Sequence, residues 1–149
     1  NNGDGTYDLG YRLEVENTGD VELRDLRVDD DLATAFAAAD AVEVLRVDAS
    51  GLDPNAGYDG GSTTNLVAGG QTLAAGARAT VDLVLRVTPG GDLGPYVNEA
   101  LANGTSPAGT ETGDGATAPA VIRLRRRWRH RLRQARAITS RTPARAPAA

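Results

Sequence analysis

The sequence predicts an all-β domain, an antiparallel sandwich of about seven short strands, on the strength of three observations. Apolar and polar residues alternate with a period of two in several runs, as they do in strands with one buried and one wet face. Turn-forming residues separate these runs, and Gly alone occurs 18 times in 149 residues. Within residues 1–118 no run shows convincing helical periodicity.

The first predicted strand covers residues 7–15, where Tyr, Leu and Val occupy the odd positions. The turn after it is predicted at residues 17–20, because Asn and Gly tolerate positive φ. A second strand is predicted over residues 21–28. Its apolar positions slip out of alternation around Arg24 and Asp25, which predicts a β-bulge there.

The middle of the chain gives weaker signals. The Ala-rich stretch 32–41 predicts a short helical turn, and the Val residues of 42–47 mark a third strand. Residues 55–64 are rich in Gly, Asp, Ser and Thr and predict an exposed loop. Tyr58 is the only large apolar anchor of that loop.

Four further segments complete the sheet prediction. Residues 66–67 and 72–73 bracket a Gly-Gly pair and predict a short hairpin. The clearest alternation of the chain lies in residues 79–88, which are followed by Pro-Gly-Gly. Residues 96–102 predict another strand, and 109–118 a weak last one.

Seven short strands with these turns are typical of an immunoglobulin-like sandwich. Its core would be aliphatic, with support from a few rings. A domain of this length holds together without disulfides, which the absence of Cys excludes in any case. The supporting rings are Tyr7, Tyr11, Phe36 and Tyr96.

An enzyme is not expected. A single His makes a Ser-His-Asp triad difficult to build. Carboxylate pairs for glycoside hydrolysis would have to come from residues 29–31 or from Glu14 and Glu16. Those acids sit in exposed runs without an aromatic platform for a sugar. The serines lack a nucleophile-elbow context, and no Gly-Gly pair opens a phosphate-binding helix.

Charge divides the chain into two parts near Pro119. Residues 1–118 hold six Arg and all 20 acidic residues, whereas residues 119–149 hold ten Arg and no acid. The chain therefore reads as a sandwich domain over 1–118 followed by an Arg-rich tail over 119–149.

Calcium is the ligand that the acidic residues favour most, because they lie in turns and at strand ends where hard oxygen ligands could converge. The spacing nevertheless lacks the pattern and the distal Glu of a calcium loop. The competing interpretation is that Asp and Asn make turns and keep the surface soluble. The main candidates are Asp4, Asp29, Asp30, Asp31 and Asp59, with Asn2, Asp92 and Asp114 in support.

The tail has two interpretations that stay open. Val121, Leu124, Trp128, Leu132 and Ala135 fall at helical spacing among Arg residues, which predicts a basic helix; the alternative for this segment is disorder. Such a helix would bind an anionic membrane or nucleic acid, or lie against the acidic domain.

The second interpretation starts from the genetic code. A gene that encodes 16 Arg and no Lys is GC-rich, and a one-base shift turns its Arg codons into codons for Asp, Gly, Ala or Val. Residues from about 116 onward would then be a frameshift product. The last strand would be cut short, leaving the edge at 96–102 poorly covered.

Short motifs in a fixed order give the domain a family resemblance over residues 1 to about 115. It resembles the extracellular repeat domain that occurs in tandem arrays in large bacterial surface and adhesin-like proteins. The motifs are Asn2–Tyr7, Val15–Asp20, Asp29–Leu32, Asp53–Asn55, Tyr58–Gly60, Asn65–Gly69, Leu73–Gly76, Val87–Gly91, Leu93–Asn98 and Gly104–Pro107.

The resemblance implies an immunoglobulin-like sandwich, export to the bacterial surface or medium, and a stalk or adhesion role without catalysis. It implies two kinds of partner, neighbouring repeat domains of the same protein and an unidentified surface ligand. Nucleic acid or membrane is a partner only if the Arg-rich tail is genuine. No cofactor is expected apart from calcium as the alternative. A Lys-Asn isopeptide crosslink is excluded because the chain has no Lys.

Overall fold

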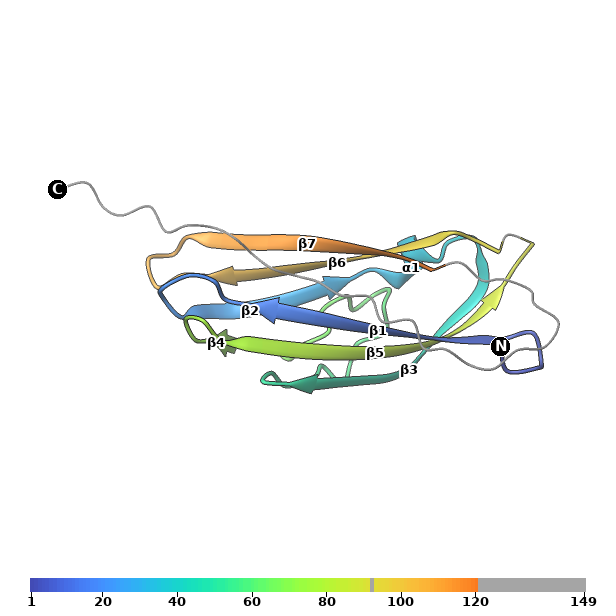
Figure 1. Ribbon diagram of the computed structural model, residues 1–149, viewed down its shortest axis with the longest axis horizontal. Coiled ribbons are helices and arrows are strands. Elements are labelled where there is room, and N and C mark those ends of the chain that lie inside the picture. The colour runs from blue at the N-terminus through green and yellow to red at the C-terminus, as the bar shows by residue number, and fades with distance from the viewer. Residues whose placement is uncertain (92, 121–149) are drawn as a thin grey trace.

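The computed structural model describes residues 1–91 and 93–120, which form a β-sandwich of seven strands and one short helix (Figure 1). All strand pairs are antiparallel. The elements are β1 (Tyr7–Glu16), β2 (Leu23–Asp30), α1 (Leu32–Ala35), β3 (Ala39–Ser50), β4 (Gln71–Leu73), β5 (Arg78–Pro89), β6 (Tyr96–Thr105) and β7 (Glu111–Ala120). No helix among these residues has the length and apolarity to cross a membrane.

The strands form two sheets, one in the order β1-β5-β3 and one in the order β4-β2-β6-β7. The prediction of an all-β antiparallel sandwich of about seven strands is therefore confirmed.

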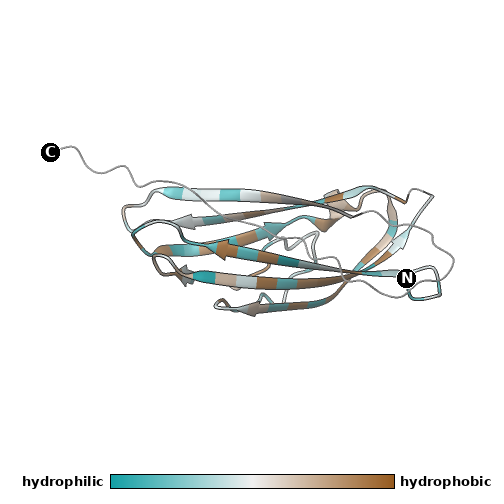
Figure 2. Ribbon diagram, viewed as in Figure 1, coloured by the Kyte–Doolittle hydropathy of each residue, from teal (hydrophilic) through white to brown (hydrophobic). Residues whose placement is uncertain are grey.

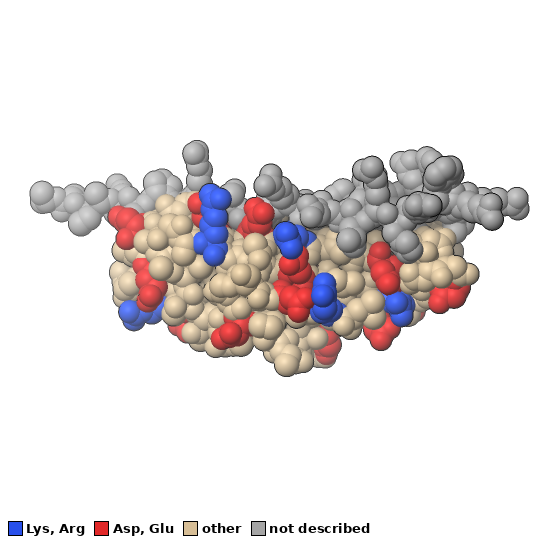
Figure 3. All heavy atoms as spheres, turned by 60° about the horizontal axis from the view of Figure 1, so that its bottom comes forward, with Lys and Arg blue, Asp and Glu red and all other residues tan. Residues whose placement is uncertain are grey.

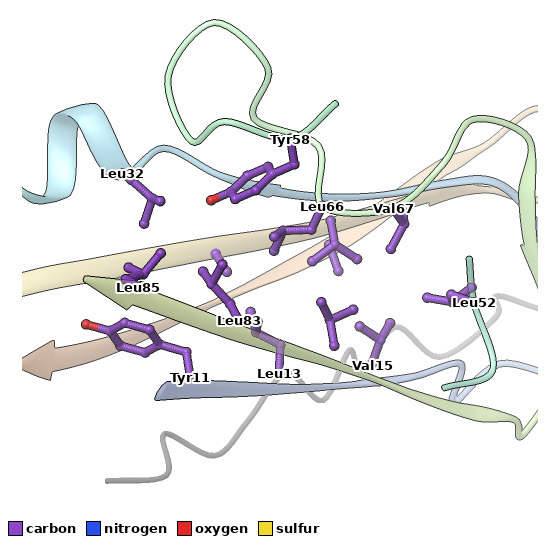
Figure 4. Close-up of a cluster of buried hydrophobic side chains, with 14 of the residues drawn as sticks. Tyr11, Leu13, Val15, Leu32, Leu52, Tyr58, Leu66, Val67, Leu83 and Leu85 are labelled. Carbon is purple, nitrogen blue, oxygen red and sulfur yellow. The ribbon is translucent and has the colours of Figure 1, made fainter. Parts of the chain in front are cut away.

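Alternation along the strands places one face of each sheet in the core (Figure 2). In β5, Val81, Leu83, Leu85 and Val87 are completely buried, while the residues between them face outward. Figure 4 shows side chains from β1, β5 and the 51–70 connection meeting between the sheets. The four predicted supporting rings, on Tyr7, Tyr11, Phe36 and Tyr96, are all buried there.

The predicted bulge in β2 is present. The pairing of β2 with β4 shifts register between Leu23 and Leu26, and its pairing with β6 shifts between Arg24 and Arg27. Asp25 has a φ of 48°, a left-handed conformation that Asp tolerates better than most residues. The extra residue puts Leu26, Val28 and Asp30 on the inner face.

The predicted hairpin of residues 66–67 and 72–73 is wrong. Val67 forms an isolated bridge with Pro54, and Asn65 forms one with Asp29. Of the two segments only 71–73 is a strand, and β4 pairs with β2. The Gly-Gly turn had suggested a local pair, but completely buried Leu66 and Val67 are held by the core instead.

The last strand is longer than the frameshift hypothesis implied. Residues 111–120 of β7 pair with the whole of β6, from Thr105 opposite Glu111 to Tyr96 opposite Ala120. The sheet edge at residues 96–102 is therefore covered. The predicted helical or disordered tail lies outside the described residues from residue 121 onward.

Outward-facing side chains of β1 and β5 form three ion pairs at directly opposed positions. Arg86 Nε donates to Asp8 Oδ1 at 2.9 Å, Arg12 Nε to Asp82 Oδ1 at 2.7 Å, and Arg78 Nη2 to Glu16 Oε1 at 3.0 Å. Arg and acidic side chains lie side by side on the face seen in Figure 3. Opposite charges at opposed positions favour this register over a slipped one.

Candidate functional site

The predicted calcium candidates are spread over several turns and strand ends of the described chain. Among the described residues no group of three or more acidic or His side chains is arranged to hold a metal ion. Asp4 instead accepts hydrogen bonds from the backbone N–H and the hydroxyl of Thr6, at 2.9 and 2.7 Å. Asp92 lies outside the described residues, and Asp114 accepts from the N–H of Gly115.

Asp31 and Asp59 each close a local turn. Asp31 caps α1, accepting from the N–H of Thr34 at 3.0 Å and from its hydroxyl at 2.7 Å. Asp59 accepts from Ser62 Oγ at 2.6 Å and from two backbone N–H groups of the same loop. These hydrogen bonds lower the pKa of Asp59 to about 2, as expected for a carboxylate that accepts several donors. The two residues act as capping and turn residues here.

Asp29 is turned outward and paired. Arg27 Nη2 donates to Asp29 Oδ1 at 2.8 Å, and the Thr64 hydroxyl donates to the same oxygen at 3.1 Å. Both contacts lower the pKa of Asp29, the guanidinium most. Of the three consecutive acids 29–31, only Asp30 turns into the core.

Asp30 is a buried carboxyl with a single side-chain donor. Only 1% of the residue is exposed, and Asn98 Nδ2 donates to its Oδ2 at 2.7 Å. Its Oδ1 makes no hydrogen bond within the described chain. Burial raises the pKa of Asp30 to about 6, against the opposing effect of Asn98 and with a smaller contribution from the charge of Asp31.

Tyr11 and Tyr58 lie on opposite sides of the core (Figure 4), and the charge of Asp30 acts on both of their hydroxyls. Tyr58 comes from the 51–70 connection, and its hydroxyl donates to the backbone carbonyl of Asp30 at 3.2 Å. Tyr11 comes from β1 in the other sheet, and its buried hydroxyl makes no hydrogen bond within the described residues. Burial and the negative charge of Asp30 raise the pKa of both phenols. We call Tyr11, Asp30, Tyr58 and Asn98 the core polar cluster.

The alternation of inward- and outward-facing side chains along β2 and β6 could have revealed part of this cluster in the sequence. Asn98 falls between Tyr96 and Ala100, at a position that the alternation of β6 assigns to the buried face. Asp30 follows Leu26 and Val28 in the same way once the bulge is allowed for. A buried carboxyl beside an amide can hold a proton at mildly acidic pH, but the cluster has no nucleophile activated by a base.

Comparison with known proteins gives no identification. No family model, no curated protein and no solved structure matches the chain. The family resemblance described for the sequence therefore stays a proposal.

We predict that Asp30 makes the domain less stable as pH rises. The unfolded chain releases the Asp30 proton near the ordinary pKa of 3.8, but the folded domain retains it up to about 6. Ionisation therefore opposes folding, with no effect below about pH 4 and a loss approaching ~3 kcal/mol above pH 7, at about 1.36 kcal/mol per pKa unit. Urea unfolding between pH 4 and pH 8 measures this loss.

Asp30→Asn should flatten this pH dependence, whereas Asp48→Asn, a change at an exposed acid of β3, should preserve it. Carboxylates with lowered pKa values, such as Asp29 and Asp59, stabilise the fold above their ordinary pKa and lose this effect below it. Maximum stability should therefore lie between about pH 4 and pH 6. If the free energy of unfolding of Asp30→Asn changed with pH in parallel with that of the unmodified chain, the pH dependence would not come from Asp30.

The two tyrosines should respond differently to loss of their hydroxyls. Tyr58→Phe removes the donor to the Asp30 carbonyl and should lower the free energy of unfolding by about 1 kcal/mol. Tyr11→Phe removes a buried hydroxyl that makes no hydrogen bond to the described residues, so it should be neutral or stabilising. Urea unfolding at pH 5, where Asp30 is mostly neutral, compares the two variants directly. A greater loss of unfolding free energy for Tyr11→Phe than for Tyr58→Phe would contradict the assignment of these hydrogen bonds.

Proposed function

We propose that the chain is a non-catalytic structural and adhesive module of a bacterial cell-surface protein. The observation that carries the proposal is the path of the chain through the sandwich. Tyr7 at the start of β1 lies opposite Val87, and Ala120 at the end of β7 lies opposite Tyr96. Tyr96 stacks on Phe36, just before β3 begins opposite Pro89. The described chain thus enters and leaves the sandwich at one end (Figure 1).

The opposite end consists of connecting turns. Gly76 donates its N–H to the carbonyl of Asn17 at 2.8 Å, which joins the turn after β1 to the turn before β5. The turn between β6 and β7 lies at this end as well, since Thr105 pairs with Arg24. The connecting turns therefore lie at the end of the sandwich opposite Tyr7 and Ala120. In the proposed stalk or spacer module, this end is the one offered for adhesion.

The composition of the domain surface supports an extracellular structural role. Each of the six Arg residues between positions 12 and 86 forms an ion pair with an acid of the same domain. The remaining acids give the domain a strongly negative net charge. Such a charge keeps a protein soluble and repels like-charged copies. Together with the family resemblance, these features support surface exposure.

Antibodies raised against the chain should label intact cells of the organism that encodes it. Brief protease treatment of those intact cells should remove the signal, while a cytoplasmic marker protein stays uncleaved. Labelling that requires permeabilised cells would contradict surface exposure. A binding partner could then be sought by crosslinking at the turn end of the domain.

A calcium-stabilised adhesion module is the second candidate, favoured by one observation. The charges of Asp30, Asp31 and Asp59 all act on the hydroxyl of Tyr58, so these three acids lie around one ring. Because the carboxylates of Asp31 and Asp59 are already engaged in local hydrogen bonds, we expect the melting temperature to be the same in millimolar calcium and in chelator. A rise with calcium that Asp59→Asn abolishes would establish the second candidate instead.

A further inference from the structure

Among the described strands, β7 is the least protected sheet edge (Figure 1). The end strands are β1 and β3 in one sheet and β4 and β7 in the other, and natural sheets protect such edges by shortness, bulges or charge. β4 has three residues, β3 is irregular at two places, and β1 carries four charged side chains. β7 pairs with β6 over ten residues without a register shift, and positions 115–120 hold no charged residue.

The backbone of β7 turns hydrogen-bonding groups toward this open edge at alternate residues. Hydrogen-bonded pairs alternate with non-bonded pairs in an antiparallel ladder, and the Ser106 N–H, which donates to the Thr110 carbonyl at 2.9 Å, sets that alternation for β6 and β7. Continued along β7, the alternation turns the N–H and C=O groups of Gly113 and Gly115 away from β6. In agreement, the N–H of Gly115 donates to Asp114 Oδ1 at 2.8 Å. An extended segment can add to such groups as a further strand.

Gly115 leaves a gap in the outer face of the sheet at this edge. Its position is exposed and carries no side chain. A Cβ atom added there would lie 3.6 Å from Leu101 Cδ1 and 3.8 Å from Glu99 Oε1, both on β6. Leu101 is 43% exposed. A long side chain on an added strand can therefore cross Gly115, lay its apolar stem on Leu101 and bring a charged end to Glu99.

The acids around this edge favour a basic occupant. Glu99, Glu111 and Asp114 lie on β6 and β7, and none of the three forms an ion pair with a described residue. At the β1 edge, by contrast, two of the three acids are paired with Arg side chains of β5. Residues 1–118 hold six Arg and 20 acidic residues, so the charge of the whole domain also attracts a cation to β7.

We propose that the open edge of β7 binds an extended, basic segment of a partner protein by strand addition. The backbone of the partner pairs with Gly113 and Gly115. An Arg or Lys of the partner beside Gly115 lies across this glycine, with its stem on Leu101 and its charge at Glu99. This surface runs along the side of the sandwich rather than at its turn end, and the binding does not depend on a cell-surface location.

Synthetic peptides test strand addition on the purified full-length chain. The probe is an eight-residue peptide of alternating Arg and Val. Its control has the same sequence with every internal amide nitrogen methylated, which removes the backbone donors and keeps the charge. Fluorescence polarisation of labelled peptides should show saturable binding of the probe and at least tenfold weaker binding of the control. Equal binding of the two peptides, or no binding up to millimolar concentration, would overturn the proposal.

Matched variants separate binding at β7 from general attraction to an acidic domain. Gly115→Val blocks the path across the edge with contacts of ordinary length, and Glu99→Gln removes the charge at its end, so each should weaken binding of the probe severalfold. Glu43→Gln makes the same charge change at an exposed position of β3 and should leave binding unchanged. Urea unfolding checks that the variants keep the fold. Equal weakening by Glu99→Gln and Glu43→Gln would overturn the assignment to β7.

Hydrogen exchange locates the contact within β7. The amides of Gly113 and Gly115 face the open edge and should exchange severalfold more slowly when the probe is bound, while the amide of Ala116, which faces β6, should not change. Unchanged exchange at both glycines, or protection confined to β1 or β3, would overturn the proposal. Full protection of both glycines without any peptide would assign the edge to another segment of the chain or to a second copy, and would overturn binding of a separate partner.

Discussion

The strand on which the rest of the sandwich depends is β5. It is the centre of its sheet and pairs with β1 on one side and β3 on the other. Its four inward side chains, at positions 81, 83, 85 and 87, are completely buried and form the aliphatic floor of the core. Its outward Arg and Asp side chains meet opposite charges on β1. A one-residue slip would exchange these two faces, so hydrophobic burial and ion pairing select the same register.

Such a core makes the presence of Asp30 costly, because a carboxylate loses its hydration there. The domain reduces that cost in two ways, by the hydrogen bond from Asn98 and by a raised pKa that keeps the group neutral in mild acid. Tyr58 fixes the backbone of the same residue. The hydrogen bond from Asn98 ties β2 to β6, and the hydrogen bond from Tyr58 ties β2 to the 51–70 connection.

Local alternation was sufficient to predict most of this fold from the sequence. The strands at 7–15 and 79–88 and the bulge at Arg24 and Asp25 follow from side-chain parity and turn chemistry. Leu66 and Val67 were misassigned because a short apolar pair beside Gly-Gly has the same pattern in a hairpin and in a buried connection. By residue type alone, the acids 29–31 form one exposed run. When the alternation of inward and outward side chains is continued through the bulge, Asp30 is the only one of the three that points inward. The same alternation places Asn98 on the inner face of β6.

Residue type alone does not define an acidic site. Asp is frequent in turns because its carboxylate accepts backbone N–H groups nearby, and Asp31 and Asp59 do this. Each such bond uses a lone pair that a metal would need, and it holds the carboxylate toward its own turn. The same reasoning applies to Asp8, Glu16 and Asp82, which face Arg across strands. The carboxylates of these five acids are therefore held by local structure, while the domain as a whole keeps an excess of acidic residues that acts at long range.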